Sequence, residues 1–334
     1  MIAGPASDDI HGLVSRLSAA GSWAEVRAML TSHASEARQH PELATAWAEA
    51  HLRTGNPRDA QAWLSETLSG IERSGDRAQV RRALNLLGVA NTELGALDDA
   101  ESSFDRAAQL ALLDGDELLV ARAHNNLAAI AHVRGRREAA IALYALALPA
   151  YQRLGSPRGL AESYHNLAIT LREQGDLDRA DECEQRAIEY AHDAGTPTLA
   201  AMARVGRAEV QLRRDDTRMA EATARIAARE LGEAGDPIRE ADALRVAGVA
   251  CTRRGDLAPA RETLERAVSL AREHGHMLIE AECLRARADA SLAMGDLALA
   301  REDLRAAVDL FVRLGADEAR DEALARLDTL SNEE

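Results

Sequence analysis

The sequence contains no lysine, so all 40 of its Lys/Arg cations are arginines. This absence excludes Schiff-base lysines and the lysine of a phosphate-binding loop. Charge is also one-sided, because 55 acidic residues against 40 arginines give a formal net charge of -15. Binding to a phosphate backbone depends on protein cations that displace counterions, and a net negative charge opposes such binding. We therefore expect no nucleic-acid partner.

Cysteines, aromatic residues and long apolar runs are also scarce. The three cysteines, Cys183, Cys251 and Cys283, are odd in number and far apart, unlike the dense pairs of a secreted disulfide scaffold. No stretch approaches the roughly 20 apolar residues of a membrane-spanning helix, and residues 1–5 lack the basic and apolar pattern of a leader. We expect a cytoplasmic protein without a membrane partner.

Glycines recur at a fixed spacing of forty residues, in two interleaved series. Each glycine closes a segment with helical apolar periodicity, and two helix breakers in each period indicate two helices per repeat. Asp215 stands where the second series expects a glycine. The first series is Gly75, Gly115, Gly155, Gly195, Gly235, Gly275 and Gly315, and the second is Gly55, Gly95, Gly135, Gly175, Gly255 and Gly295.

An alanine series keeps the same step without exception, which indicates a place where two helices lie too close for a larger side chain. It comprises Ala60, Ala100, Ala140, Ala180, Ala220, Ala260 and Ala300. Another alanine follows seven residues later in six repeats, on the same helix face. Larger side chains four residues after the first alanine should fill the core, at Leu64, Phe104, Tyr144, Leu264 and Leu304.

One repeat illustrates the expected pair of helices. Asp76 can cap a first helix that ends at Gly95, and a second helix runs from there to Gly115. Asp236 and Thr196 offer the same capping chemistry in later repeats.

These positions resemble the tetratricopeptide repeat family, whose motif is matched by Leu87-Gly88, Ala100, Phe104 and Ala107. The usual repeat is about 34 residues long, whereas forty-residue repeats are similar to those of kinesin light chain and of bacterial Rap-type peptide receptors. The resemblance implies an all-α fold, a right-handed α-α superhelix of about seven helix-turn-helix repeats.

The chain ends depart from the repeat pattern. We expect a degenerate capping repeat at residues 1–40, an array of seven repeats at 41–318, and a C-terminal capping helix with a polar tail at 319–334. Capping elements of this kind shield the open faces of a solenoid.

In the family, the first helix of each repeat lines a concave groove, and this register assigns the groove positions. Polar residues gather there and are predicted to be donors without nearby acidic partners. The predicted peptide-binding groove comprises Arg82, Asn85, Arg122, Asn125, Asn126, His132, His165, Asn166 and Arg172, with a weaker second patch at Arg245 and Arg285.

The strings Asn126-Leu127-Ala128 and Asn166-Leu167-Ala168 resemble the kinesin light chain motif, whose asparagines hold the backbone of a bound peptide. Amides suit that role because they both donate and accept hydrogen bonds, and neighbouring arginines can bind carboxylates. The leading hypothesis is a non-catalytic adaptor that binds an acidic, extended segment of a partner protein.

Other interpretations stay open. The polar residues could simply solvate the concave surface, the chain could be a peptide-responsive receptor resembling the Rap class, or it could be a homo-oligomeric assembly module. Enzyme activity has only His132 and His165 to draw on. His274-Gly275-His276 indicates a turn, so we expect neither metal nor cofactor.

The fifth repeat and the repeat before it place charges at positions that are apolar elsewhere. Glu184 occupies an aromatic position, and Arg204 and Arg207 occupy leucine-like ones. Opposite charges at packed positions are costly unless they meet, so we hypothesise that Glu184 pairs with Arg204 or Arg207. The alternative is that all three side chains extend to water.

Overall fold

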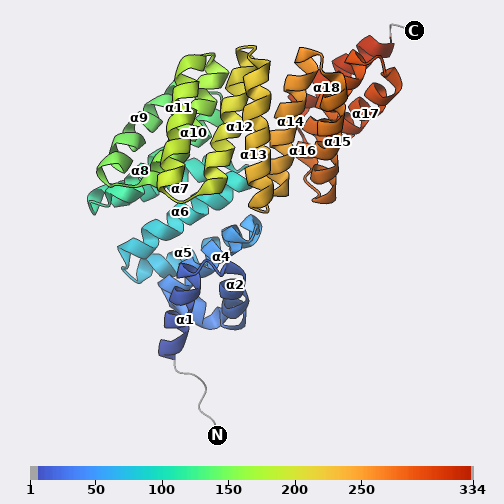
Figure 1. Cartoon of the computed structure of the whole chain (residues 1–334). Coiled ribbons are helices and arrows are strands. Elements are labelled where there is room, and N and C mark those ends of the chain that lie inside the picture. The colour runs from blue at the N-terminus through green and yellow to red at the C-terminus, as the bar shows by residue number, and fades with distance from the viewer. Residues whose placement is uncertain (1–6, 332–334) are drawn as a thin grey trace. The chain divides into compact units, whose positions relative to one another are not determined.

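The computed structural model describes residues 7–331, and every regular element in that range is an α-helix. The chain is divided into two compact units, with the boundary between Gly155 and Ser156. Each unit is a stack of antiparallel helices that follow the chain order (Figure 1). The fold is an all-α helical-repeat solenoid, as the glycine and alanine series predict.

The first unit contains nine of the described helices. They are α1 (Ser7–Ala19), α2 (Trp23–Ser32), α3 (Ala34–Gln39), α4 (Pro41–Arg53), α5 (Pro57–Arg73), α6 (Arg77–Glu93), α7 (Leu97–Leu113), α8 (Glu117–Val133) and α9 (Arg137–Arg153). The region before residue 41 forms three helices instead of the two of a degenerate repeat, because the segment from Trp23 is divided at His33.

The second unit contains the other nine described helices. They are α10 (Pro157–Gln174), α11 (Leu177–Asp193), α12 (Pro197–Arg213), α13 (Thr217–Glu233), α14 (Pro237–Arg254), α15 (Leu257–Glu273), α16 (Met277–Ala293), α17 (Leu297–Leu314) and α18 (Asp317–Ser331). The expected C-terminal helix is present as α18, where Leu330 is buried and Leu327 packs on the core of this unit. Residues 332–334 of the expected polar tail lie outside the described residues.

The small and large core positions are buried as predicted. Every alanine of the first series has no exposed surface. The larger residues four positions later, from Leu64 to Leu304, are at most 1% exposed. Burial of each such side chain contributes about 1.5 to 3 kcal/mol, so these recurring positions hold the helix pairs together.

Helix ends follow the local chemistry of the turns, with one exception. Asp76 accepts a hydrogen bond from the backbone N–H of Gln79, and Asp236 accepts one from that of Arg239. Thr196 was expected to cap α12 in the same way, but its hydroxyl donates to the carbonyl oxygen of Ala191 at 3.1 Å. The capping prediction for Thr196 is wrong because its hydroxyl turns back to the last turn of the preceding helix, where the Ala191 carbonyl oxygen also accepts from the Thr196 backbone N–H.

Asp215 adopts the left-handed conformation that its place in the glycine series requires, with φ 62°. The glycines of both series also have positive φ. A side chain with a Cβ is strained in this region by about 1 to 2 kcal/mol, and somewhat less for Asp. We expect Asp215→Gly to raise the free energy of unfolding by up to about 1 kcal/mol, measured by urea denaturation. Lower stability of Asp215→Gly would contradict this account.

The first helices of successive repeats lie next to each other within each unit. In the second unit, α10 contacts α12, α12 contacts α14, and α14 contacts α16. The second helices of these repeats make no comparable contacts with each other among the described residues. The first helices therefore form the inner layer of this unit, and their free faces provide a continuous surface.

Candidate functional site

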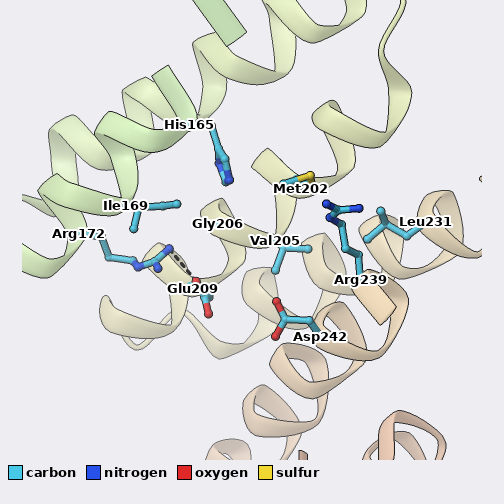
Figure 2. Close-up of a pocket in the computed structure, with 10 residues that line it drawn as sticks. All are labelled: His165, Ile169, Arg172, Met202, Val205, Gly206, Glu209, Leu231, Arg239 and Asp242. Atoms are coloured by element: carbon cyan, nitrogen blue, oxygen red, sulfur yellow. Dashed lines mark ion pairs between the residues drawn. The ribbon is translucent and has the colours of Figure 1, made fainter. Parts of the chain in front are cut away.

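Two adjoining pockets lie on the inner layer of the second unit. The first, which we call the His165 pocket, has a volume of about 180 Å³ and is drawn in Figure 2. It is lined by His165, Ile169, Arg172, Met202, Val205, Gly206, Glu209, Leu231, Arg239 and Asp242. Helices α10, α12 and α14 supply nearly all of these residues, with Leu231 from α13.

The imidazole of His165 points into this pocket (Figure 2), and its Nδ1 contacts Glu184. His165 Nδ1 lies 2.9 Å from Glu184 Oε2, and Glu184 has no exposed surface. Burial lowers the pKa of His165, but the nearby carboxylate of Glu184 outweighs this and holds that pKa above its usual value. Burial also raises the pKa of Glu184. The two groups therefore share a proton.

Gly206 makes room for this buried carboxyl group. A Cβ at position 206 would overlap with Glu184 Oε1. The corresponding positions in other repeats carry side chains, for example Leu86 and Val246. The missing side chain thus opens the His165 pocket and admits Glu184 at the same place.

The second pocket, which we call the arginine pocket, has a volume of about 360 Å³. Its lining includes six arginines and three acidic residues, a balance of +3 in a chain whose formal charge is -15. The charged lining residues are Arg172, Arg213, Arg245, Arg253, Arg285, Arg326, Glu209, Glu282 and Asp289. Local charge is therefore opposite in sign to the net charge of the protein.

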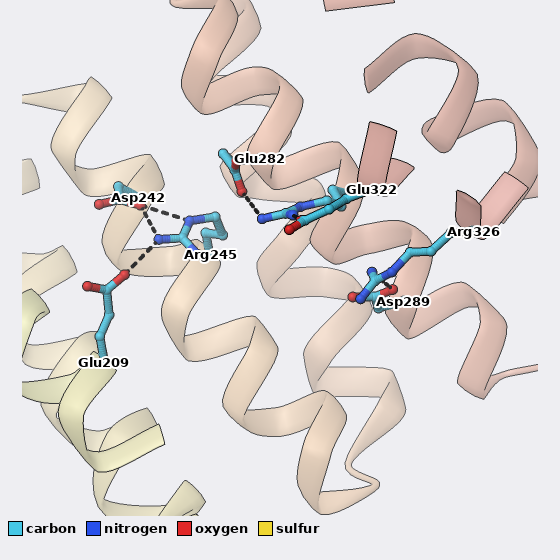
Figure 3. A network of polar contacts seen from close by, with 8 residues as sticks. Glu209, Asp242, Arg245, Glu282, Asp289, Glu322 and Arg326 are labelled. Carbon is cyan, nitrogen blue, oxygen red and sulfur yellow. Dashed lines mark hydrogen bonds and ion pairs between the residues drawn. The ribbon is translucent and has the colours of Figure 1, made fainter. Parts of the chain in front are cut away.

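Four of these arginines are held by acidic neighbours, three of them in the network of Figure 3. Arg245 Nη2 lies 2.7 Å from an Asp242 oxygen and 3.1 Å from Glu209. Glu209 also forms an ion pair with Arg172 at 2.7 Å. Further along, Arg285 pairs with Glu282 and Glu322, and Arg326 pairs with Asp289. These pairs fix the guanidinium groups in place.

Arg213 and Arg253 differ, because neither forms an ion pair with any residue in the described range 7–331. Both are exposed. Arg253 donates a hydrogen bond to the carbonyl oxygen of Leu212 at 2.9 Å. These two guanidinium groups are the ones with charge available for a ligand.

The hypothesis that Glu184 pairs with Arg204 or Arg207 is wrong. Arg204 pairs with Glu230 at 2.6 Å, and Arg207 pairs with Asp181 at 2.8 Å. Glu184 faces α10 instead and contacts His165. The alternative of three solvent-exposed side chains also fails, since Glu184 is completely buried.

The predicted groove residues Arg172, His165, Arg245 and Arg285 line the two pockets of the second unit. The expectation that His165 and Arg172 lack acidic partners is wrong, because Glu184 pairs with His165 and Glu209 pairs with Arg172. In the weaker second patch, Arg245 pairs with Glu209 and Asp242, and Arg285 pairs with Glu282 and Glu322. In the same unit Asn166 is half-buried.

The other predicted residues belong to the first unit. Arg82 pairs with Glu49 at 2.7 Å, which again contradicts the expected absence of acidic partners. Asn125 is buried and offers little surface to a ligand. Arg122 is exposed, and Asn85, Asn126 and His132 are half-buried.

Sequence reasoning missed Arg213, Arg253 and Arg326, as well as the acidic residues that organise the pockets. A signal was present in the forty-residue register. His132 and Arg172 occupy the same position of successive repeats, and Arg213 and Arg253 occupy the next position in the two repeats that follow. Met202 and Val205 carried no such signal, since apolar residues are common throughout the array.

The histidines around Gly275 form a turn, as expected. His276 Nδ1 accepts a hydrogen bond from the backbone N–H of Ile279 at 3.3 Å and so caps α16.

Within residues 7–331, no group of three or more His, Cys, Asp or Glu side chains is arranged to hold a metal ion. None of the helices described is long and apolar enough to cross a membrane.

The family model described as tetratricopeptide repeat matches residues 41–112 and 119–191. No curated protein matches the sequence. The structure resembles a Rap protein complexed with competence and sporulation factor, with a TM-score of 0.64 and 14% identity over 98% of this chain and 99% of that chain. It also resembles the apo form of RapI, with a TM-score of 0.68 and 12% identity over 83% of this chain and 99% of that chain. A third similar structure is BtubC (BKLC) from P. vanneervenii, with a TM-score of 0.51 and 24% identity over 70% of this chain and 93% of that chain.

Proposed function

We propose that this chain, of which residues 41–112 and 119–191 match the tetratricopeptide repeat model, is a non-catalytic interaction protein whose second unit binds an acidic, extended segment of a partner protein. The arginine pocket is the observation that carries this proposal. It concentrates six arginines on the inner layer of an otherwise acidic chain. The partner's segment lies along the first helices of the repeats.

The chemistry of the pocket favours carboxylates. Guanidinium groups bind carboxylates through two parallel hydrogen bonds, and several such groups in one place discriminate against neutral segments. Arg213 and Arg253 supply charge that no acidic residue of the described chain neutralises, while Arg245 is held in place by Asp242 and Glu209. A carboxylate of the ligand supplies the acidic partner that Arg213 and Arg253 lack within the described chain.

The layout of the inner layer favours an extended ligand. The His165 pocket and the arginine pocket share Arg172 and Glu209, so they adjoin each other. Together their linings extend from α10 to α18. A single side chain would occupy only one of them, whereas a segment of several residues can contact both.

We expect the double variant Arg213→Ala/Arg253→Ala to bind a fluorescein-labelled hexaglutamate peptide about tenfold more weakly than the wild type. Loss of two charged contacts at a partly exposed site is expected to cost about 1 to 2 kcal/mol. Fluorescence anisotropy at low ionic strength measures the affinity, and added salt should weaken wild-type binding because it screens these charges.

A matched control removes the same charge from the second helices. Arg218 on α13 and Arg261 on α15 are exposed, so Arg218→Ala/Arg261→Ala changes the net charge equally and leaves the inner layer intact. This control should bind hexaglutamate as the wild type does, within about twofold. Equal losses in both double variants, or no measurable binding by the wild type, would overturn the proposed function.

A further inference from the structure

The His165 pocket has an unusual arrangement, a completely buried carboxyl group behind the one histidine that lines it. Glu184 Oε2 contacts His165 Nδ1, while Glu184 Oε1 has no hydrogen-bond partner among the described residues and lies against Gly206. A core position that carries Leu, Phe or Tyr in other repeats has become acidic. A buried polar atom without a hydrogen-bond partner, such as Glu184 Oε1, costs stability.

The number of protons held by the Glu184–His165 pair decides what His165 offers to a ligand. If Glu184 is ionised and His165 is charged, both ring nitrogens carry hydrogen. If instead Glu184 is protonated, its O–H donates to Nδ1, and the hydrogen of the neutral ring lies on Nε2. In both arrangements Nε2 is a donor. Only after the pair loses a further proton does Nδ1–H donate to the carboxylate, which leaves Nε2 as an acceptor.

The ion pairs around the Glu184–His165 pair leave its surroundings without net charge. Arg172 of α10 pairs with Glu209 of α12, Arg245 of α14 pairs with Glu209 and Asp242, and Arg239 of α14 pairs with Asp236. These six side chains sum to zero, and the Glu184–His165 pair is neutral while it shares its proton, so a negative group in the pocket meets no net repulsion and can accept the Nε2 hydrogen. Cys183 on α11 is uncharged, because burial raises the pKa of its thiol to about 11.

We propose that the His165 pocket binds one acidic side chain of the partner's segment, with its carboxylate accepting a hydrogen bond from His165 Nε2. This inference rests on the proposed function, since that side chain belongs to the segment held in the arginine pocket. Glu184 acts as a positioning residue that keeps the proton on Nε2. The volume of about 180 Å³ suffices for a glutamate side chain, and its methylene groups would pack against Ile169, Met202 and Val205.

The sign of the pH dependence follows from the proton count. The Nε2 donor is present below the raised pKa of the pair and is lost as pH rises through that value. Above it, the pair carries a negative charge and its acceptor nitrogen faces the ligand carboxylate. Affinity for hexaglutamate should therefore fall by about tenfold from pH 7 to high pH, the usual effect of one charge-assisted hydrogen bond.

Glu184→Leu separates this inference from a purely structural role of Glu184. Leucine occupies the equivalent core position in other repeats, so the fold should be retained. Without the carboxylate, burial lowers the pKa of His165, and the ring is already neutral at pH 7. Between pH 7 and high pH the affinity of this variant for hexaglutamate should stay constant within about twofold. A wild-type slope that persists in Glu184→Leu would overturn the inference.

Nuclear magnetic resonance of wild-type protein labelled with ¹⁵N and ¹³C in its histidines reports on His165 directly. Addition of hexaglutamate should shift the His165 Nε2 signal, and uncharged hexaglutamine should not. Met202→Trp provides a second variant, because it fills the pocket without touching Glu184; we expect it to abolish the hexaglutamate-induced shift of His165.

The outcomes distinguish the two proposals. If hexaglutamate does not bind at all, the proposed function fails. If it binds through Arg213 and Arg253 but leaves the His165 signal unchanged, the proposed function survives and this inference is wrong. A hexaglutamine shift as large as that of hexaglutamate would equally overturn the assignment of a carboxylate.

Discussion

Asp303→Ala is expected to lower the free energy of unfolding by about 3 to 5 kcal/mol. Asp303 is 2% exposed and binds Arg287 through both carboxylate oxygens, at 2.8 and 2.7 Å. Its removal leaves the guanidinium group of Arg287 without its carboxylate in a largely buried place. Urea denaturation followed by far-ultraviolet circular dichroism measures the loss.

The double variant Arg287→Met/Asp303→Leu tests whether the cost comes from the unpaired charge. Leucine-like residues occupy the Arg287 position in other repeats, so the two apolar side chains should pack and restore stability to within about 1 kcal/mol of the wild type. Asp309 is exposed on the same helix, and Asp309→Ala should change stability by less than about 0.5 kcal/mol. If the double variant were as unstable as Asp303→Ala, loss of packing would be the better explanation.

Gly88→Ala is expected to destabilise the first unit by about 1 to 3 kcal/mol. A Cβ at position 88 would lie 2.5 Å from Cε1 of Phe104, whose side chain is 1% exposed and cannot move aside without disturbing the core. The usual preference of helices for alanine over glycine, about 1 kcal/mol, is too small to offset this overlap. Thermal unfolding provides the measurement.

Gly70→Ala is the matched control, because Gly70 also lies inside a helix but a Cβ there would meet nothing within 4 Å. The same chemical change should therefore raise stability, by about 0.5 to 1 kcal/mol. The contrast depends only on the space around the two glycines. Should both substitutions stabilise the protein, Phe104 must have more freedom than its burial implies.

The fold was predictable because its requirements are local and repeat. Left-handed turns select glycine, and Asp215 shows how well the register alone locates such a turn, since it has the required positive φ without being glycine. Close helix contacts select alanine, and all members of the first series are buried. Each requirement acts within one helix pair, so seven repetitions reinforce a weak signal.

The charge pairs were not predictable in the same way. Glu184 has Arg204, Arg207 and His165 within reach in the repeat register, and the sequence cannot tell which of them it faces. The direction of each side chain decides this: Arg207 extends toward Asp181, Arg204 toward Glu230, and Glu184 toward α10. Long side chains in a helical stack have several acceptors at similar distances, and small rotations of the helices select among them.

The candidate site was therefore predicted only in part. Helix register located His165, Arg172, Arg245 and Arg285, which line the two pockets. It could not indicate that Glu209 would pair with both Arg172 and Arg245. The absence of a side chain at Gly206 was visible in the sequence, but its meaning depends on the buried carboxyl group beside it.

The spacing between successive first helices sets which residues of an extended ligand can contact each repeat. Packed helix axes are about 8 to 10 Å apart, whereas an extended chain advances about 3.3 Å per residue. Roughly every third residue of the ligand then meets a new repeat. A recognition sequence for the second unit should accordingly have a period of three, with the intervening residues facing solvent and free to vary.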